Sequence, residues 1–381
     1  MMTLLLSCLG FTLWVTSAMS ADPKGDLRPT MQSIFRALTI VFPLSLSEES
    51  FEKAENRQQI QDSLRTLTRS ATSLASHGDS IPPSFDFLQR SLSQDAQEAS
   101  TLYEAGYYEE ARFVFQQLID NCFLCHSQLP SAQPFVLGQR FLKELERGHL
   151  PPLPPYDQVR IAVATRQFDS ALAACEALFQ SRATPAVQID LMAFFEDYLR
   201  IVIRVHRDFV RAINTMEAFL KRPDVPRYLN DHITTWVETL KALQHDSSDG
   251  SELSRAQRLI QQGQKHNRFL ADRRGLIYFA VASSDLHRYV STGSKPAAQL
   301  AQAYYLLGVS DSYMPRSSWI SETEFFLERA IRLAPESAIA KTAYSFLEEY
   351  VMTGFAGSAH AETLNTIYPQ LSELRRLIDG S

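Results

Sequence analysis

The chain has 381 residues, of which 45% are hydrophobic and 21% are charged, and its net charge is −6. These values are typical of a globular protein that is long enough to form two domains. The negative net charge, together with the lack of a long basic stretch, argues against a nucleic-acid partner.

The first residues have the pattern of an export signal. Residues 3–18 are apolar and are followed by small residues and then by the polar Asp22. This pattern predicts a signal peptide over residues 1–20, cleaved next to Ser20, and therefore a periplasmic protein. A lipoprotein signal ending at Cys8 is an alternative, but it leaves almost no residues before the apolar segment. No later stretch is apolar for long enough to predict a transmembrane span.

Residues 22–130 are expected to form a first domain of amphipathic helices. Apolar side chains recur there every three or four residues, which is the period of a helix with one buried face. Pro43 is expected to end the first helix, and Ser45–Glu48 has the pattern of a capping box that begins the second. The predicted helices run over residues 29–42, 45–77, 84–106 and 107–127.

A Cys-x-x-Cys-His motif lies near the end of the last of these helices, at Cys122, Cys125 and His126. Two thiols at this spacing can each add to a vinyl group of one porphyrin, and the adjacent histidine can then ligate the iron. We therefore predict one covalent haem c with His126 as its proximal ligand. The alternatives are a disulfide, a thioredoxin-type redox pair and half of a zinc site, although no second close pair of zinc ligands is visible.

The position of the thiols on the helix predicts where the haem lies. They belong to a stripe with steps of four, three, four and three residues, which should face the core of the domain. The haem is therefore expected inside the helical domain. Cys175, which has no predicted partner, is expected to be a buried small hydrophobe. The stripe consists of Ala111, Phe115, Leu118, Cys122 and Cys125.

Four helices with this motif near the end of the last one resemble the cytochrome c-prime and cytochrome c-556 group. The resemblance covers residues 26–130 and implies a four-helix bundle whose first helix supplies the residue over the distal face of the haem. A methionine there gives a six-coordinate electron-transfer centre, whereas an apolar residue leaves the iron five-coordinate and open to small gases. The sequence Arg28-Pro29-Thr30-Met31 is similar to the opening of the group, so the resemblance implies Met31 as the distal iron ligand.

The chain departs from this group after the motif, where Ser127–Pro130 offers no basic residue to pair with a haem propionate. Arg28 is the substitute candidate for that role. Met31 has an alternative role as a filler of the apolar core, which is common for methionine. His77 and His149 are alternative distal ligands.

Residues 131–155 are predicted to connect this domain to a second one. They contain one further expected helix, over residues 135–147, and a stiff proline-rich linker at Leu150–Pro155. Residues 156–381 have the pattern of successive short helices and resemble a tetratricopeptide-like helical array. Gln244–Ser254 is the predicted loop within it. The repeat pattern, an aromatic residue followed by alanine and large apolar residues at helical spacing, begins at Phe168, Phe209 and Phe325.

An all-α fold with these features is compatible with three functions. The leading hypothesis is an exported mono-haem electron-transfer protein whose helical array docks a redox partner protein or complex. The second is a five-coordinate haem that binds or senses a diatomic gas and passes the signal through the array. The third is an enzyme such as a peroxidase, which needs distal acid–base groups that the sequence does not identify. A homodimer interface is an alternative use of the array.

Overall fold

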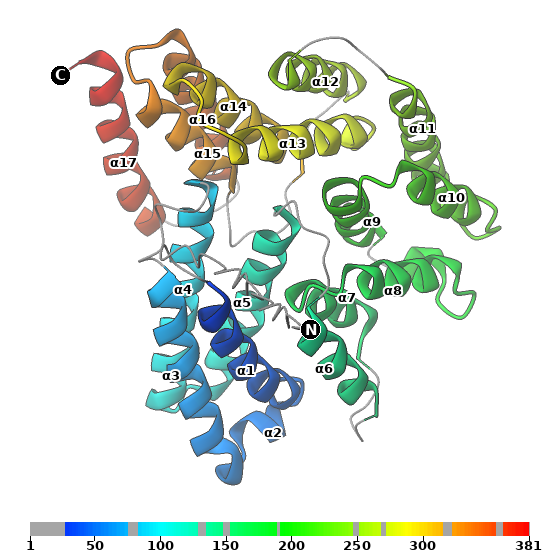
Figure 1. Cartoon of the computed structure of the whole chain (residues 1–381), viewed down its shortest axis with the longest axis vertical. Helices are drawn as coiled ribbons and strands as arrows, with labels where there is room; N and C mark the ends of the chain where they lie inside the picture. Colours follow the sequence, from blue (N-terminus) through cyan, green and yellow to red (C-terminus); the bar gives the residue numbers. More distant parts are fainter. Residues whose placement is uncertain are drawn as a thin grey trace, which may run out of the picture.

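The computed structural model describes residues 27–74, 83–128, 135–147, 153–188, 191–246, 251–267, 272–314, 322–355 and 361–380. Within these ranges the protein is all-α and contains no strand, as the sequence predicted (Figure 1). Its α-helices are α1 (Arg28–Ser45), α2 (Glu48–Glu52), α3 (Arg57–Leu74), α4 (Pro83–Ala105), α5 (Tyr108–Gln128), α6 (Val136–Arg147), α7 (Pro155–Ala164), α8 (Phe168–Gln180), α9 (Leu191–Leu199), α10 (Phe209–Leu220), α11 (Arg227–Gln244), α12 (Glu252–His266), α13 (Leu276–Ser291), α14 (Ala297–Ser312), α15 (Glu322–Leu333), α16 (Ala338–Phe355) and α17 (Ala361–Asp379). Shorter elements are the 3-10 helices η1 (Ala54–Asn56) and η3 (Ala186–Gln188) and the π-helix η4 (Arg200–His206).

The first part of the chain packs its long helices side by side, α1 on α3, α3 on α4 and α4 on α5 (Figure 1). The apolar stripe predicted for the first helix is buried, with Ile34, Leu38 and Val41 at most 4% exposed. Removing these stripes from water is the main force that holds the helices together. We call the apolar cluster that they enclose the N-terminal core; its fully buried members include Phe42, Phe51, Ile60, Leu67 and Phe115.

Pro43 does not end α1, contrary to the prediction, because the helix continues to Ser45. A proline lacks the N–H that would bond to the carbonyl four positions earlier, and its ring crowds that carbonyl. The residues around it are nevertheless held in place, because Phe42 is fully buried and the buried Ser45 hydroxyl donates to the carbonyl of Phe42 at 2.8 Å. The chain therefore completes its final turn in spite of the proline.

The second predicted helix is interrupted in the structure. It begins as the short α2, capped by the Ser47 hydroxyl, which accepts from the N–H of Ser50 at 3.3 Å. The backbone of Lys53 then leaves the helical region, with φ −58° and ψ 128°. The side chain of Asn56 donates to the carbonyl of Ser50 at 2.8 Å and so stabilises the break before α3 begins.

One type of helix–turn–helix junction occurs before α5, α8 and α10. A residue with positive φ follows the preceding element. The N–H of the next residue then donates a hydrogen bond to a carbonyl of that element, as in a Schellman turn. In the junction before α8, the N–H of Gln167 donates to the carbonyl of Ala162 at 2.7 Å. The left-handed region costs an L-residue roughly 1–2 kcal/mol, so glycine is the usual choice. The three residues are Gly106, Arg166 and Arg207, with φ of 87°, 58° and 56°.

The helices from α7 to α17 enclose a second apolar cluster, which we call the C-terminal core. The chain runs there in an arc from α7 through α11 to α17 (Figure 1). Helices α14 and α15 approach closely at Gly308, where a Cβ atom would lie only 2.7 Å from Cγ of Leu327. A side chain larger than hydrogen would therefore force the pair apart.

The two cores meet at α5. Helix α7 packs on α5, and α15 packs on α4. Ile161 of α7 belongs to the N-terminal core, whereas Phe123 of α5 belongs to the C-terminal core. On the other side, the rings of Phe87 and Phe325 stack with centroids 5.0 Å apart. The domain boundary at residues 131–155 stays a prediction, and side chains from both sides of it interlock.

The helix predicted over residues 135–147 is confirmed as α6. The predicted signal peptide, His77 and His149 lie outside the described residues. Across the ranges given above, no helix combines the length and apolar character needed to cross a bilayer.

Candidate haem-attachment site

Helix α5 carries the Cys-x-x-Cys-His motif in its last two turns. It begins after the turn at Gly106, with Glu109 and Glu110 in its first turn, where negative charge stabilises a helix. At its other end Cys122 is 8% and His126 7% exposed, and Cys125 is half-buried. The motif is therefore enclosed by neighbouring helices.

The two thiols face different neighbours. Cys122 belongs to the N-terminal core, as its helical stripe predicted. Cys125 instead packs in a small separate cluster with Phe87, Leu88 and Leu124, so the prediction that both thiols face one core is wrong in this detail. The reason is that the last turns of α5 extend between the two cores and are covered from several sides.

The imidazole of His126 is held by the end of α7. Its Nδ1 atom lies 3.2 Å from the carbonyl oxygen of Val163. A neutral ring that donates its Nδ1–H keeps its lone pair on Nε2, which is then the atom able to ligate a metal. Burial lowers the pKa of His126 to about 4, although the carbonyl of Val163 opposes this effect. The ring is thus neutral at pH 7, as a metal ligand must be.

Burial favours the protonated form of both motif thiols. Burial raises the pKa of Cys122 to about 12, and the neighbouring charge of Asp120 adds to the effect. Burial also raises the pKa of Cys125, whereas the positive charge of Arg166 lowers it. A thiol needs its thiolate form to act as a redox nucleophile or to bind zinc. This geometry therefore offers little support to a thioredoxin-type pair.

Two polar residues just before Cys122 anchor the motif to its neighbours. The Arg160 Nε of α7 donates to Asp120 Oδ1 at 2.9 Å, and both side chains are buried. The Asn121 amide donates to Asp95 Oδ2 of α4 at 2.5 Å. Burial raises the pKa of Asp95 to about 6, against the opposing effect of this hydrogen bond.

The two residues that the resemblance carried over lie on α1. Met31 is half-buried and packs at the edge of the N-terminal core, which also contains Cys122. Arg28 is exposed at the first position of α1. The hydrogen bond of the His126 ring is to α7 and not to α1. Ligation of iron by Met31 and propionate pairing by Arg28 therefore both stay predictions.

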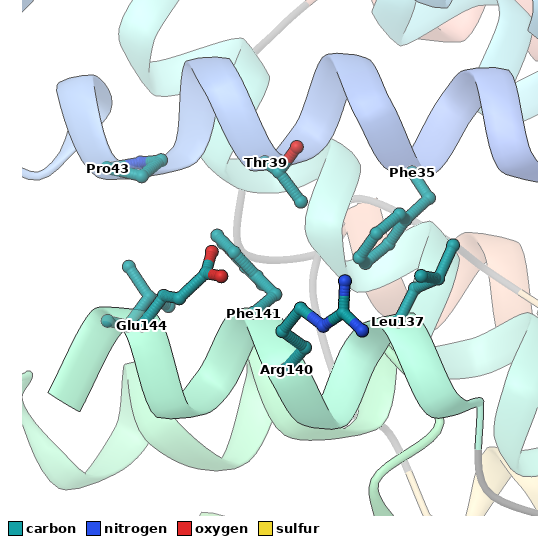
Figure 2. Close-up of a pocket in the computed structure, with 8 residues that line it drawn as sticks. Phe35, Thr39, Pro43, Leu137, Arg140, Phe141 and Glu144 are labelled. Carbon is teal, nitrogen blue, oxygen red and sulfur yellow. The ribbon is translucent and has the colours of Figure 1, made fainter. Parts of the chain in front are cut away.

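A groove of about 430 Å³ separates α1 from α6. Figure 2 shows Phe35 pointing from α1 toward α6 and Phe141 pointing back toward α1. Their rings meet edge to face with centroids 6.0 Å apart. A second cavity, of about 400 Å³, lies between α1 and α3. No motif residue lines either cavity, so a porphyrin would have to part the side chains that now pack on the motif.

Comparison of the chain with models of known protein families, with curated proteins and with solved structures finds no match. The chemistry of the site is therefore argued from its own residues. Within the described parts of the chain, no three His, Cys, Asp or Glu side chains converge as a metal site, so the zinc alternative gains no further ligands there.

The residues at the end of α5 fit a haem c in their donor chemistry. They supply two thiols for the thioether bonds and a neutral imidazole whose Nδ1–H is already donated to a carbonyl, as is usual for histidines that ligate metals. Buried arginine N–H groups that have no partner among the described residues lie on the neighbouring η4, at Arg200 and Arg204. These could receive the negative charges of the haem carboxylates.

Sequence reasoning missed the residues that surround the motif. Arg166, whose charge acts on both Cys125 and His126, lies in a turn of the second predicted domain. No sequence signal connects it to the motif. Arg200 and Arg204 did leave a signal, because they interrupt an otherwise apolar run four residues apart.

Proposed function

We propose that this protein is an exported mono-haem c-type cytochrome that transfers electrons to a redox partner. The observation that carries the proposal is the buried Cys-x-x-Cys-His motif at the end of α5, with the Nδ1 atom of His126 bonded to the carbonyl of Val163. When bound, the haem supplies one-electron redox chemistry. Cys122 and Cys125 would hold it covalently, and His126 would ligate the iron through the ring nitrogen that does not face the carbonyl of Val163.

Several further features support an electron carrier. The motif is shielded from water by both cores, and a low-dielectric environment is one of the means by which a protein sets a haem potential. Met31 lies on the same core as Cys122 and is the proposed distal ligand. We infer an N-terminal four-helix bundle of the cytochrome c-prime kind, followed by a tetratricopeptide-like array whose exposed faces dock the partner protein.

The experiment that tests the function starts with the full-length protein produced with a cytochrome c maturation system. Its intact mass is expected to exceed that of the mature polypeptide by one haem. Absorption spectra are then recorded for both oxidation states, with and without CO. With Met31 on the iron, both states are expected to be low-spin and to bind CO poorly. Met31→Ala should give a high-spin component and admit CO.

Met216 provides a matched control, because it is a fully buried methionine of the C-terminal core. Met216→Ala is expected to lower stability by about 2–5 kcal/mol without changing the haem spectrum. A mass equal to that of the bare polypeptide would rule out the haem. A wild-type protein that is high-spin and binds CO, with no spectral change in Met31→Ala, would instead favour the gas-binding alternative.

A further inference from the structure

The π-helix η4 places two charged side chains inside the C-terminal half of the molecule. Arg200 is 3% and Arg204 7% exposed, and the other buried residues of η4 are apolar. π-helical turns are rare and are frequently found at functional sites. A guanidinium remains charged inside a protein, so its burial is costly unless an anion or several acceptors surround it.

Both arginines have buried Nε and Nη1 atoms without a partner in the described structure, and they differ in the acceptors of Nη2. Arg204 donates to Asp311 Oδ1 at 2.9 Å and to Ser283 Oγ at 2.7 Å. Arg200 makes one described hydrogen bond, from Nη2 to the carbonyl of Met314. The Nε and Nη1 atoms of Arg200 are buried without a partner in the described structure. Arg200 is therefore a buried cation with two unused N–H groups, although the charges of Asp311, Glu322 and Asp197 act on it.

This cation is close to the helix that carries the haem motif. Helix η4 packs directly against α5. Phe123, which lies between the two motif cysteines, shares the C-terminal core with Ile201. Gln128, at the end of α5, donates to Glu322, and the charge of Glu322 in turn acts on Arg200. Glu322 thus connects the end of the motif helix to the arginine.

We propose that Arg200, assisted by Arg204, binds a propionate carboxylate of the haem attached to α5. This inference rests on the proposed function. A carboxylate accepts charge-assisted hydrogen bonds from a guanidinium, and Nε and Nη1 of Arg200 are the atoms without an acceptor in the described structure. The C-terminal half of the chain would then replace the basic residue that Ser127–Pro130 lacks.

Two other sources of the same chemistry must be distinguished. A free anion such as phosphate can satisfy Arg200 as a carboxylate does, and buried water can also bond to unpaired donors. Arg166 is a second cation near the motif, but it is half-exposed and does not need an anion to compensate for deep burial. The experiments below separate these cases.

The first test compares Arg200→Met in two forms of the full-length chain, produced with and without the maturation system. In the haem-free chain, the change removes a buried guanidinium with two unsatisfied N–H groups and is expected to raise the melting temperature. In the haem-bearing chain, Arg200→Met leaves a propionate without its partner, so the melting temperature is expected to fall. Shifts of the same sign in both forms would overturn the proposal.

The second test observes the propionate directly in the haem-bearing protein, by the resonance Raman bending mode of the haem propionates. Arg200→Gln is expected to shift this band, and Arg200→Lys is expected to restore it in part. Arg166→Gln is the matched control, because it also removes one positive charge near the motif. A band that moves in Arg166→Gln and not in Arg200→Gln would assign the propionate to Arg166 and refute the proposal.

The two proposals fail in different ways. A mass equal to the bare polypeptide overturns both of them. A haem-bearing protein in which Arg200 variants change neither the Raman band nor the sign of the stability shift overturns only the propionate site. A third outcome would show that the site binds a free anion instead. In that case added phosphate raises the melting temperature of the haem-free chain, and Arg200→Met abolishes the rise. The haem-bearing chain then shows no Raman shift in the Arg200 variants.

Discussion

The N-terminal and C-terminal cores are both built from helices, but they differ in the groups that they enclose. The N-terminal core contains aliphatic and aromatic side chains together with the thiol of Cys122. The C-terminal region also buries charged and titratable groups at Arg200, Arg204, Asp311 and His287. Burial and the two nearby arginines hold the pKa of His287 well below its usual value, so this ring is neutral.

This difference indicates where the function lies. An apolar side chain needs no polar partner when it is buried, because packing and removal from water stabilise it. A buried charge has a large desolvation cost and needs a partner. Helix α5 joins the two environments, with Cys122 in one core and Phe123 in the other. The Cys-x-x-Cys-His motif therefore lies at the seam where the buried charged groups of one region meet the apolar interior of the other.

The cysteines provide the strongest test of this comparison, because each core contains one that is buried. Changing Cys122 and Cys125 together to alanine removes both thioether bonds, so covalent haem is expected to be lost completely. Intact mass and the visible spectrum measure this loss. Cys175→Ala, in the C-terminal core, should retain a full haem content and lower stability by only about 1 kcal/mol. Equal haem content in all of these variants would contradict the assignment.

The ion pair across the seam is expected to have the next largest effect. Arg160 and Asp120 are 2.9 Å apart, with side chains 7% and 8% exposed. Arg160→Met leaves the Asp120 carboxylate buried without its cation, which should lower the free energy of unfolding by about 3–5 kcal/mol. Urea unfolding curves of the haem-free chain measure this change.

An exposed pair in the N-terminal helices is the control for this measurement. Arg65 and Glu104 are 2.8 Å apart but 49% and 40% exposed. Arg65→Met should therefore change the free energy of unfolding by less than about 1 kcal/mol. If Arg160→Met costs no more than Arg65→Met, the seam contributes little and the two cores fold independently.

The smallest expected effect concerns the pH dependence of stability. Asp95 has a folded-state pKa of about 6 against an ordinary value of 3.8. Folding therefore favours the protonated form of the Asp95 carboxyl. The stabilisation that results is complete below pH 3.8 and is lost as the pH rises through about 6. Asp95→Asn should remove this loss and make the variant relatively more stable at pH 7. A difference in unfolding free energy that is the same at pH 4 and pH 7 would contradict this prediction.

Much of the secondary structure could be predicted from the sequence because its signals are local. The spacing of Ile34, Leu38 and Val41 identifies a buried helix face, and the face is buried as expected. The motif is equally local, since its three chemical groups lie within five residues. Local rules failed at Pro43, because α1 continues past the proline to Ser45.

The sequence alone indicated most of the helices and the prediction for the motif, and only the tertiary structure decided the surroundings of the motif. Val163, which holds His126, is 37 residues away from it along the chain. Phe123 turned out to face the second core, and Arg200 to be buried beside α5. Such partners depend on how whole helices pack against each other. Helical periodicity shows that a face is buried, but it carries no information about which distant side chain covers it.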